Sequence, residues 1–237
     1  LEEMPSTPNG KGDRKVVAGG VGNRAEEPEG YEAPRDETEE KLAAIWGEVL
    51  GVEKIGVREN FFELGGHSLK AVRMFTVVEE TFKKNIPLAT LFEAGTIERL
   101  AEIIRMEGWE EPESSIVAIQ PKGTKPPFFC IHAKGGNVLF YKDLAKHLGE
   151  DQPFYGIQAR RVGGRQVGHA TVEEMAEFYI REIKAIQPEG PYYLGGSSFG
   201  GYAAFEMARQ LTAKGHKIGI LAMFDTSTPE YKKLMPG

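Results

Sequence analysis

The sequence is poor in the residues that crosslink a chain or bind metal ions. Its 237 residues include one cysteine, Cys130, which excludes a disulfide within the chain and fits a reducing compartment. The five histidines never combine with that cysteine at the spacing of zinc ligands, so we expect no metal site. Basic residues number 29 against 35 acidic ones, and the net charge of −6 leaves no surplus to bind nucleic acid.

Long hydrophobic stretches are missing as well. The longest apolar stretch covers residues 218–224, whereas a membrane-spanning helix needs about 20 apolar residues. The first residues, LEEMP, lack the basic-then-apolar order of a signal peptide. We therefore expect a cytoplasmic protein that binds neither nucleic acid nor membranes.

The chain divides into segments of different composition. Residues 1–34 contain four prolines and six glycines without an apolar period, which is typical of a tail and linker. Residues 35–107 form the first predicted domain, and the acidic, polar segment 108–115 is a second linker. The amphipathic helices of that domain are predicted from apolar residues three or four positions apart, at Leu42, Ile45, Trp46, Val49 and Leu50, at Ala71, Met74, Phe75, Val78 and Phe82, and at Ile97, Leu100, Ala101 and Ile104. With a short fourth helix near 88–92, this domain is an all-α four-helix bundle.

Residues 116–237 have a different rhythm, in which short apolar runs alternate with helical stretches. The predicted strands are 116–119, 128–131, 154–157, 192–194 and 218–224, and the predicted helices lie near 138–148, 172–186 and 199–213. Strands that alternate with helices indicate a mostly parallel sheet covered on both faces. The second domain is therefore expected to be α/β.

A glycine-rich turn carries the strongest chemical signal in this second domain. The segment 192–201, YYLGGSSFGG, leads from an apolar strand through G-x-S-x-G into a helix. That order is typical of a nucleophile elbow, in which small neighbours let a serine hydroxyl stand out at the top of a sheet. Ser198 has Gly196 and Gly200 two positions away on either side. Ser197 has a bulky phenylalanine at that distance, so Ser198 is the candidate nucleophile, and a plain glycine-serine turn is the alternative.

An acyl-transfer serine also needs backbone N–H donors for the oxyanion that forms when it attacks. We expect the first donor at Phe199, at the start of the following helix, where free N–H groups favour negative charge. The second should lie in the glycine loop after strand 128–131, with Lys134 as the candidate and Ala133 as the alternative. Without Ser198, this His-x-x-Gly-Gly loop would be interpreted as an ordinary glycine turn.

The other members of a serine triad are an acid and a histidine, which follow the serine in that order in α/β-hydrolases. Asp225 ends the predicted strand 218–224 and is the candidate acid, with a loop-capping aspartate as the alternative. No histidine follows Asp225, and we interpret His132 as a buried or loop-orienting residue. We therefore expect either that the α/β-hydrolase-type domain is truncated before its histidine, or that it lacks triad chemistry.

The first domain has a signal of its own in residues 60–69, NFFELGGHSL. A glycine pair precedes Ser68, which opens the second predicted helix and by ordinary rules is its N-cap. The same position exposes a hydroxyl at the positive end of a helix dipole, where an attached phosphodiester would be tolerated. Ser68 is therefore either a helix cap or the attachment point of a phosphate-linked arm.

Residues 36–105, with FFELGGHSL at 61–69, resemble a peptidyl carrier protein of a nonribosomal peptide synthetase. The resemblance implies that a phosphopantetheinyl transferase attaches 4'-phosphopantetheine to Ser68. Residues 1–17, with TPNGKGDRK at 7–15, resemble the end of an adenylation domain, in which the lysine at the position of Lys11 reaches the adenylate. With the rest of that domain absent, we expect no function for Lys11 here.

Residues 116–237 resemble the first part of a type I thioesterase domain, the releasing domain after the last carrier. The resemblance implies that Ser198 is the nucleophile, Asp225 the acid, and Phe199 and Lys134 the oxyanion donors. It also implies upstream condensation and adenylation domains as partners, and a peptidyl or acyl thioester as substrate. Two alternatives remain: a carrier and docking module with a non-catalytic hydrolase-like domain, and an esterase fused to an unrelated helical bundle.

Overall fold

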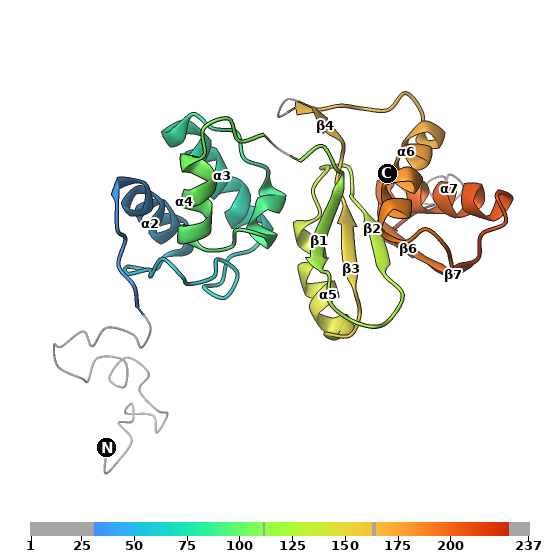
Figure 1. Ribbon diagram of the computed structural model, residues 1–237, viewed down its shortest axis with the longest axis horizontal. Helices are drawn as coiled ribbons and strands as arrows, with labels where there is room; N and C mark the ends of the chain where they lie inside the picture. Colours follow the sequence, from blue (N-terminus) through green and yellow to red (C-terminus); the bar gives the residue numbers. More distant parts are fainter. Residues whose placement is uncertain (1–30, 111, 163–164, 228–237) are drawn as a thin grey trace, which may run out of the picture. The chain divides into compact units, whose positions relative to one another are not determined.

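The computed structural model describes residues 31–110, 112–162 and 165–227 (Figure 1). The segment 1–17 that resembles the end of an adenylation domain, including Lys11, lies outside these ranges. None of the helices within them combines the length and the apolar character that a membrane span requires.

The first part of the described chain is a helical bundle. Its elements are α2 (Glu37–Leu50), α3 (Ser68–Phe82), the 3-10 helix η1 (Leu88–Phe92) and α4 (Ile97–Arg105). Side chains cap the N-termini of two of these helices. Asp36 accepts a hydrogen bond from the Glu39 N–H at 3.0 Å, and Thr96 accepts one from the Arg99 N–H at 3.3 Å. The short fourth helix is a 3-10 helix and not an α-helix, and Pro87 occupies its N-cap.

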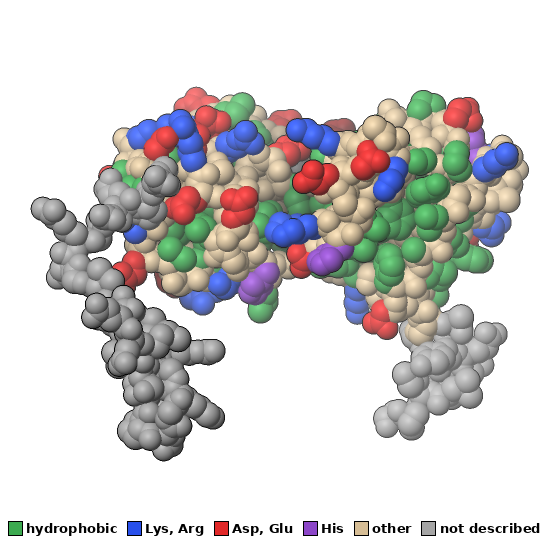
Figure 2. Space-filling view, turned by 90° about the horizontal axis from the view of Figure 1, so that it is seen from below, with side chains coloured by type: hydrophobic (Ala, Val, Ile, Leu, Met, Phe, Trp, Pro, Cys, Tyr) green, Lys and Arg blue, Asp and Glu red, His purple; other side chains and the backbone are tan. Residues whose placement is uncertain are grey.

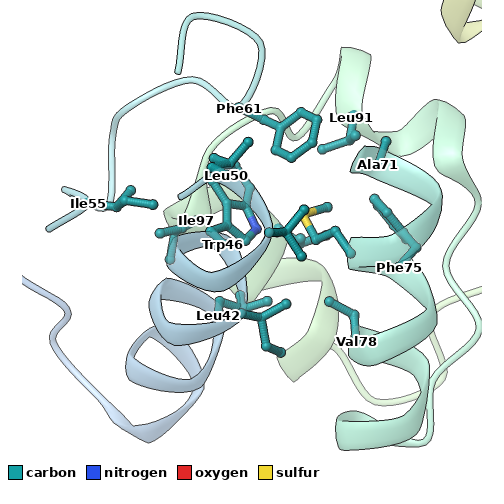
Figure 3. Close-up of a cluster of buried hydrophobic side chains, with 14 of the residues drawn as sticks. Leu42, Trp46, Leu50, Ile55, Phe61, Ala71, Phe75, Val78, Leu91 and Ile97 are labelled. Atoms are coloured by element: carbon teal, nitrogen blue, oxygen red, sulfur yellow. The ribbon is translucent and has the colours of Figure 1, made fainter. Parts of the chain in front are cut away.

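The core of the bundle combines most of the apolar positions that the helical period predicted with buried side chains from the loops, such as Ile55 and Phe61 (Figure 3). Trp46 of α2 is fully buried, and its ring meets Phe61 edge-on with centroids 5.2 Å apart. Phe61 belongs to the long connection between α2 and α3, so the loop before Ser68 is anchored in the core by an aromatic side chain.

The second part is built around a five-stranded sheet, with the strand order β1-β3-β2-β6-β7. The strands are β1 (Ile116–Gln120), β2 (Phe128–Ile131), β3 (Phe154–Ile157), β6 (Tyr192–Ser197) and β7 (Ile218–Phe224). β1 pairs antiparallel with β3, and every other pairing within this five-stranded sheet is parallel. The expected mostly parallel sheet is confirmed. The structure adds a small hairpin, β4 (Arg161–Val162) and β5 (Arg165–Gln166), which the sequence did not predict.

Helices cover both faces of this sheet, and alternate side chains of β2 pack against the two layers. Phe129 and Ile131 pack into the cluster formed with α6 (Val172–Ile186) and α7 (Phe199–Ala213). Phe128 and Cys130 point the other way, toward Tyr141 of the 3-10 helix η2 (Leu139–Tyr141) and toward α5 (Lys142–Leu148). All four β2 residues are buried, as expected for a central parallel strand.

The strand β7 forms one edge of the sheet among the described residues. Two of its apolar side chains are exposed, Ile220 by 46% and Met223 by 41%. Figure 2 shows apolar side chains gathered on the part of the surface that carries β6, β7 and α7.

Candidate active site and carrier serine

Ser198 lies at the turn between β6 and α7 in a backbone conformation that side chains rarely adopt. Its φ is 54° and its ψ is −114°. The flanking glycines explain how so tight a turn is built. A Cβ on Gly196 would lie 2.1 Å from the carbonyl oxygen of Gly200, and one on Gly200 would lie 2.4 Å from that of Ile131. Only glycine fits at either position, so the elbow that the sequence predicted has its geometric reason.

Backbone hydrogen bonds hold this turn on both sides. The Ser198 N–H donates to the carbonyl of Phe224 at 2.8 Å, which ties the turn to the end of β7. The Ser198 carbonyl accepts from the Gly201 N–H and from the Thr226 hydroxyl, each at 3.1 Å. Ser198 itself is exposed. The turn therefore presents its serine to solvent on a well-anchored backbone.

The two predicted oxyanion donors have N–H groups that make no hydrogen bond within the described part of the chain. Phe199 is the first residue of α7, where an N–H has no partner inside the helix. Lys134 lies in the loop after β2. There the carbonyl of Ala133 accepts from Gly136 N–H at 2.9 Å. Because C=O and N–H point in opposite directions across a trans peptide, that bond turns the Lys134 N–H away from the interior of the loop.

His132 supports the same loop, and its contacts define its protonation. Its Nδ1 lies 2.6 Å from the Ala133 carbonyl, and its Nε2 lies 2.9 Å from the Tyr179 hydroxyl. A carbonyl can only accept, so Nδ1 carries the hydrogen and Nε2 accepts from the tyrosine. Burial lowers the pKa of His132, which favours this neutral form. With both nitrogens engaged, His132 orients the loop and has no free nitrogen to take a proton from Ser198.

Asp225 directly follows β7, is exposed, and has a φ of 47°. Its neighbour Phe224 is the residue that accepts the Ser198 N–H, so serine and aspartate stand on adjoining strand ends. Among the described residues, none of the histidines forms a hydrogen bond with Ser198 or Asp225. The structure thus brings together Ser198, Phe199, Asp225 and the Lys134 loop at the carboxyl edge of the sheet.

Ser68 is the first residue of α3, and the N-cap is His67. The prediction that Ser68 itself caps the helix was wrong, because the extended backbone that defines an N-cap falls one residue earlier. The Ser68 hydroxyl makes no hydrogen bond within the described residues and is half-buried. The first turn of α3 contains no acidic residue, so the positive end of the helix dipole is not neutralised. A hydroxyl without a hydrogen-bond partner at such a helix start fits an attached phosphodiester.

The glycine pair before Ser68 has two separate structural reasons. Gly65 has a φ of 83° with open space around it, so it supplies the left-handed turn. Gly66 packs directly on Phe61, where an added Cβ would lie 2.3 Å from a ring carbon and 2.4 Å from the carbonyl oxygen. The Gly66 N–H also donates to that carbonyl at 2.9 Å. The loop is thereby pressed against the core of the bundle just before the serine.

Sequence reasoning missed three residues that support the turn at Ser198: Tyr141, Tyr179 and Thr226. Each makes a hydrogen bond with the turn or with the loop after β2. Both tyrosines lie in helical segments, where an apolar period predicts only core packing. No signal in a single sequence would reveal their hydroxyl contacts, because these form between elements distant along the chain.

Two family models match the chain. Residues 40–104 match the phosphopantetheine attachment site family, and residues 126–235 match the thioesterase domain family. These matches cover the helical bundle and the α/β part, respectively, and they agree with the two domains expected from the sequence.

Two relatives align with nearly the whole chain. The chain is 40% identical over its whole length to malpinin synthetase of Mortierella alpina, of which it covers 3%. It is 38% identical over 95% of its length to the dimodular nonribosomal peptide synthase of Bacillus subtilis (strain 168), of which it covers 9%. The chain thus spans less than a tenth of the length of either relative.

A solved structure agrees with these relatives. Holo-AB3403, a four-domain nonribosomal peptide synthetase bound to AMP and glycine, is 35% identical, with a TM-score of 0.52. The match covers 97% of this chain and 17% of that one. The chain therefore consists of a carrier domain of the phosphopantetheine attachment type followed by a thioesterase domain of the α/β-hydrolase fold, and it is similar over nearly its whole length to nonribosomal peptide synthetases.

Proposed function

We propose that this chain is the terminal carrier and chain-releasing thioesterase of a nonribosomal peptide or hybrid peptide-polyketide synthetase. Ser68 would hold 4'-phosphopantetheine, which supplies a flexible arm whose thiol carries the acyl chain. The acyl group would then be transferred to Ser198 and released from it. The observation that carries the proposal is the turn at Ser198, where a positive φ and two glycines without room for a side chain present an exposed hydroxyl.

The proposed reaction has two steps, each with a defined role for this chain. Ser198 Oγ attacks the carbonyl carbon of an acyl thioester, the carbon–sulfur bond breaks, and the thiol leaves with the proton that the serine gives up. The N–H groups of Phe199 and Lys134 would stabilise the oxyanion, and Asp225 would orient the base that relays the proton. Water, or a nucleophile within the acyl chain, then cleaves the ester on Ser198.

The domain limits that accompany this proposal are 35–107 for the carrier, 108–115 for the linker and 116–237 for the thioesterase domain, after the tail 1–34. The proposed partners are a phosphopantetheinyl transferase, upstream condensation and adenylation domains, and a peptidyl or acyl thioester. Cytoplasmic localisation stays a prediction.

The carrier half of the proposal is tested by intact mass. The purified chain is incubated with coenzyme A, Mg²⁺ and a broad-specificity phosphopantetheinyl transferase, beside a Ser68→Ala variant. We expect one phosphopantetheine increment on the wild type and none on the variant. No increment on a folded wild type would reduce Ser68 to a residue of the first helical turn and favour the esterase alternative.

The thioesterase half is tested with a fluorophosphonate probe, which reacts with activated serines. We expect one label on the wild type, located at Ser198 by peptide mapping, and no label on a Ser198→Ala variant. Because Ser197 is the neighbouring hydroxyl, Ser197→Ala is the matched control and should still be labelled. A wild-type chain that loads phosphopantetheine but resists the probe would favour the non-catalytic docking alternative.

A further inference from the structure

The hydroxyl of Tyr141 bridges two strand ends beside the turn at Ser198. It lies 2.7 Å from the carbonyl oxygen of Ile131, at the end of β2, and 2.8 Å from the backbone nitrogen of Ser197. The carbonyl can only accept, so the tyrosine O–H donates to Ile131, and the tyrosine oxygen accepts from the Ser197 N–H. The side chain is 3% exposed, so water does not substitute for either bond.

Both backbone groups lie at the ends of their strands, where the pairing of β2 with β6 no longer provides a hydrogen-bond partner for each of them. β2 pairs with β6 up to Ile131 and Gly196, so Ser197 has no partner on β2. Without another acceptor, the Ser197 N–H would be left without a hydrogen bond in a partly buried place, which is unfavourable. Tyr141, from the 3-10 helix η2, supplies the hydrogen-bond acceptor for this N–H.

The position of this bridge matters because Ser197 immediately precedes the strained residue Ser198. A positive φ at a residue with a side chain persists only when the surroundings hold it. Hydrogen bonds with Phe224, Gly201 and Thr226 fix the backbone of Ser198 itself. On the β6 side, the hydrogen bond to the tyrosine fixes the residue before it. The same hydroxyl donates a hydrogen bond to the carbonyl of Ile131, the last residue of the strand that leads into the loop with Lys134.

We infer that Tyr141 is a positioning residue of the thioesterase site, which sets the place of Ser198 relative to the loop that would supply the second oxyanion donor. This inference rests on the proposed function of Ser198. Burial raises the pKa of the Tyr141 phenol above its usual value, so the hydroxyl keeps the hydrogen that it donates to Ile131 at neutral and mildly alkaline pH.

The test is the variant Tyr141→Phe in the full chain, which removes one oxygen atom and keeps the ring in place. Tyr155→Phe is the matched control, because the Tyr155 hydroxyl makes no hydrogen bond within the described residues although its ring stacks on Phe129. Labelling by the fluorophosphonate is measured over a range of probe concentrations. We expect Tyr141→Phe to lower the maximal labelling rate constant about ten-fold or more and to leave the half-saturating concentration unchanged. Tyr155→Phe should match the wild type.

Amide hydrogen exchange supplies the second readout. In Tyr141→Phe the Ser197 amide should lose protection, while amides in the middle of β6 keep theirs. If the phenylalanine variant does not fold, 3-fluorotyrosine at position 141 replaces it, and a smaller loss of maximal rate is expected because its oxygen is a weaker acceptor.

The outcomes separate this inference from the proposed function. Equal maximal rates for wild type and Tyr141→Phe, with Ser197 equally protected, would overturn the positioning role and leave the proposed function intact. A folded wild type without any label would overturn the proposed function, and with it the catalytic purpose of Tyr141, while the exchange of Ser197 would still decide whether the bridge exists.

Discussion

Ser198 and Asp225 both adopt a positive φ, 54° and 47°, and hydrogen bonds join their turns. The Ser198 N–H donates to the carbonyl of Phe224, the residue before Asp225, at 2.8 Å. Each turn ends one of two neighbouring parallel strands, so both residues leave the sheet at the same edge. The geometry of the nucleophile therefore depends on the strand that bears the candidate acid.

The close contact at Gly200 predicts that a methyl group there separates α7 from β2. A Cβ would lie 2.4 Å from the Ile131 carbonyl oxygen and 2.6 Å from that of His132, and backbone atoms cannot move aside cheaply. We expect Gly200→Ala to lower the free energy of unfolding by about 1–3 kcal/mol and to slow the labelling of Ser198. Gly168→Ala is the control, because its Cβ would meet open space. Equal losses in both variants, in urea unfolding and probe labelling, would contradict the contact.

The tautomer of His132 is a second prediction. The Nδ1–H form donates to Ala133, and Nε2 accepts from Tyr179. Nitrogen NMR of the imidazole at neutral pH should show this form in the wild type. Tyr179→Phe removes the donor to Nε2 and should lower the free energy of unfolding by about 1–2 kcal/mol, whereas Tyr155→Phe should change it little. Observation of the Nε2–H form would refute the assignment.

An ion-pair cluster at the start of α2 predicts a dependence of carrier stability on pH. Glu39 has a side chain only 1% exposed and contacts Arg35 at 2.7 Å and Arg105 at 3.1 Å. The Arg35 hydrogen bond lowers the pKa of Glu39 to about 2 from 4.5. Since the folded-state pKa is lowered, the stabilisation is complete above about pH 4.5 and is lost as the pH falls toward 2.

Glu39→Gln tests that cluster against Glu40→Gln, a change at an exposed neighbour. At pH 7 we expect Glu39→Gln to lower the free energy of unfolding by roughly 1–2 kcal/mol, less than the pKa change alone implies, because both arginines are partly exposed and solvent screens them. The difference from wild type, measured by hydrogen exchange of α2 amides, should shrink between pH 4.5 and 2. A difference independent of pH over that range would argue against the ion pairs.

The loop before Ser68 predicts unequal effects for two adjacent glycines. Gly65→Ala meets open space and only strains a left-handed backbone, which costs about 1 kcal/mol. Gly66→Ala would press on the ring and carbonyl of Phe61 and should cost more. We therefore expect Gly66→Ala to slow phosphopantetheine loading of Ser68 more strongly than Gly65→Ala. A reversed order of loading rates would show that the packing on Phe61 does not hold this loop.

Much of the local structure follows from the sequence by itself. Three strands, at 128–131, 154–157 and 218–224, begin and end where the apolar runs predict, as do the helices over 172–186 and 199–213. The chemical pattern G-x-S-x-G also identifies the turn at Ser198, because only glycine fits at both flanking positions. Period and spacing are local properties, and the local backbone expresses them directly.

Only the tertiary structure determines which contacts these helices, strands and loops make with one another. The N-cap of α3 is His67 and not Ser68, because the extended backbone of the loop packed on Phe61 ends one residue before the serine. The roles of Tyr141 and Tyr179 arise from hydroxyls that reach the end of β2 from opposite faces of the sheet. A hydrogen bond between residues 47 or 56 positions apart has no trace in local periodicity, because only the packed sheet brings its two atoms together.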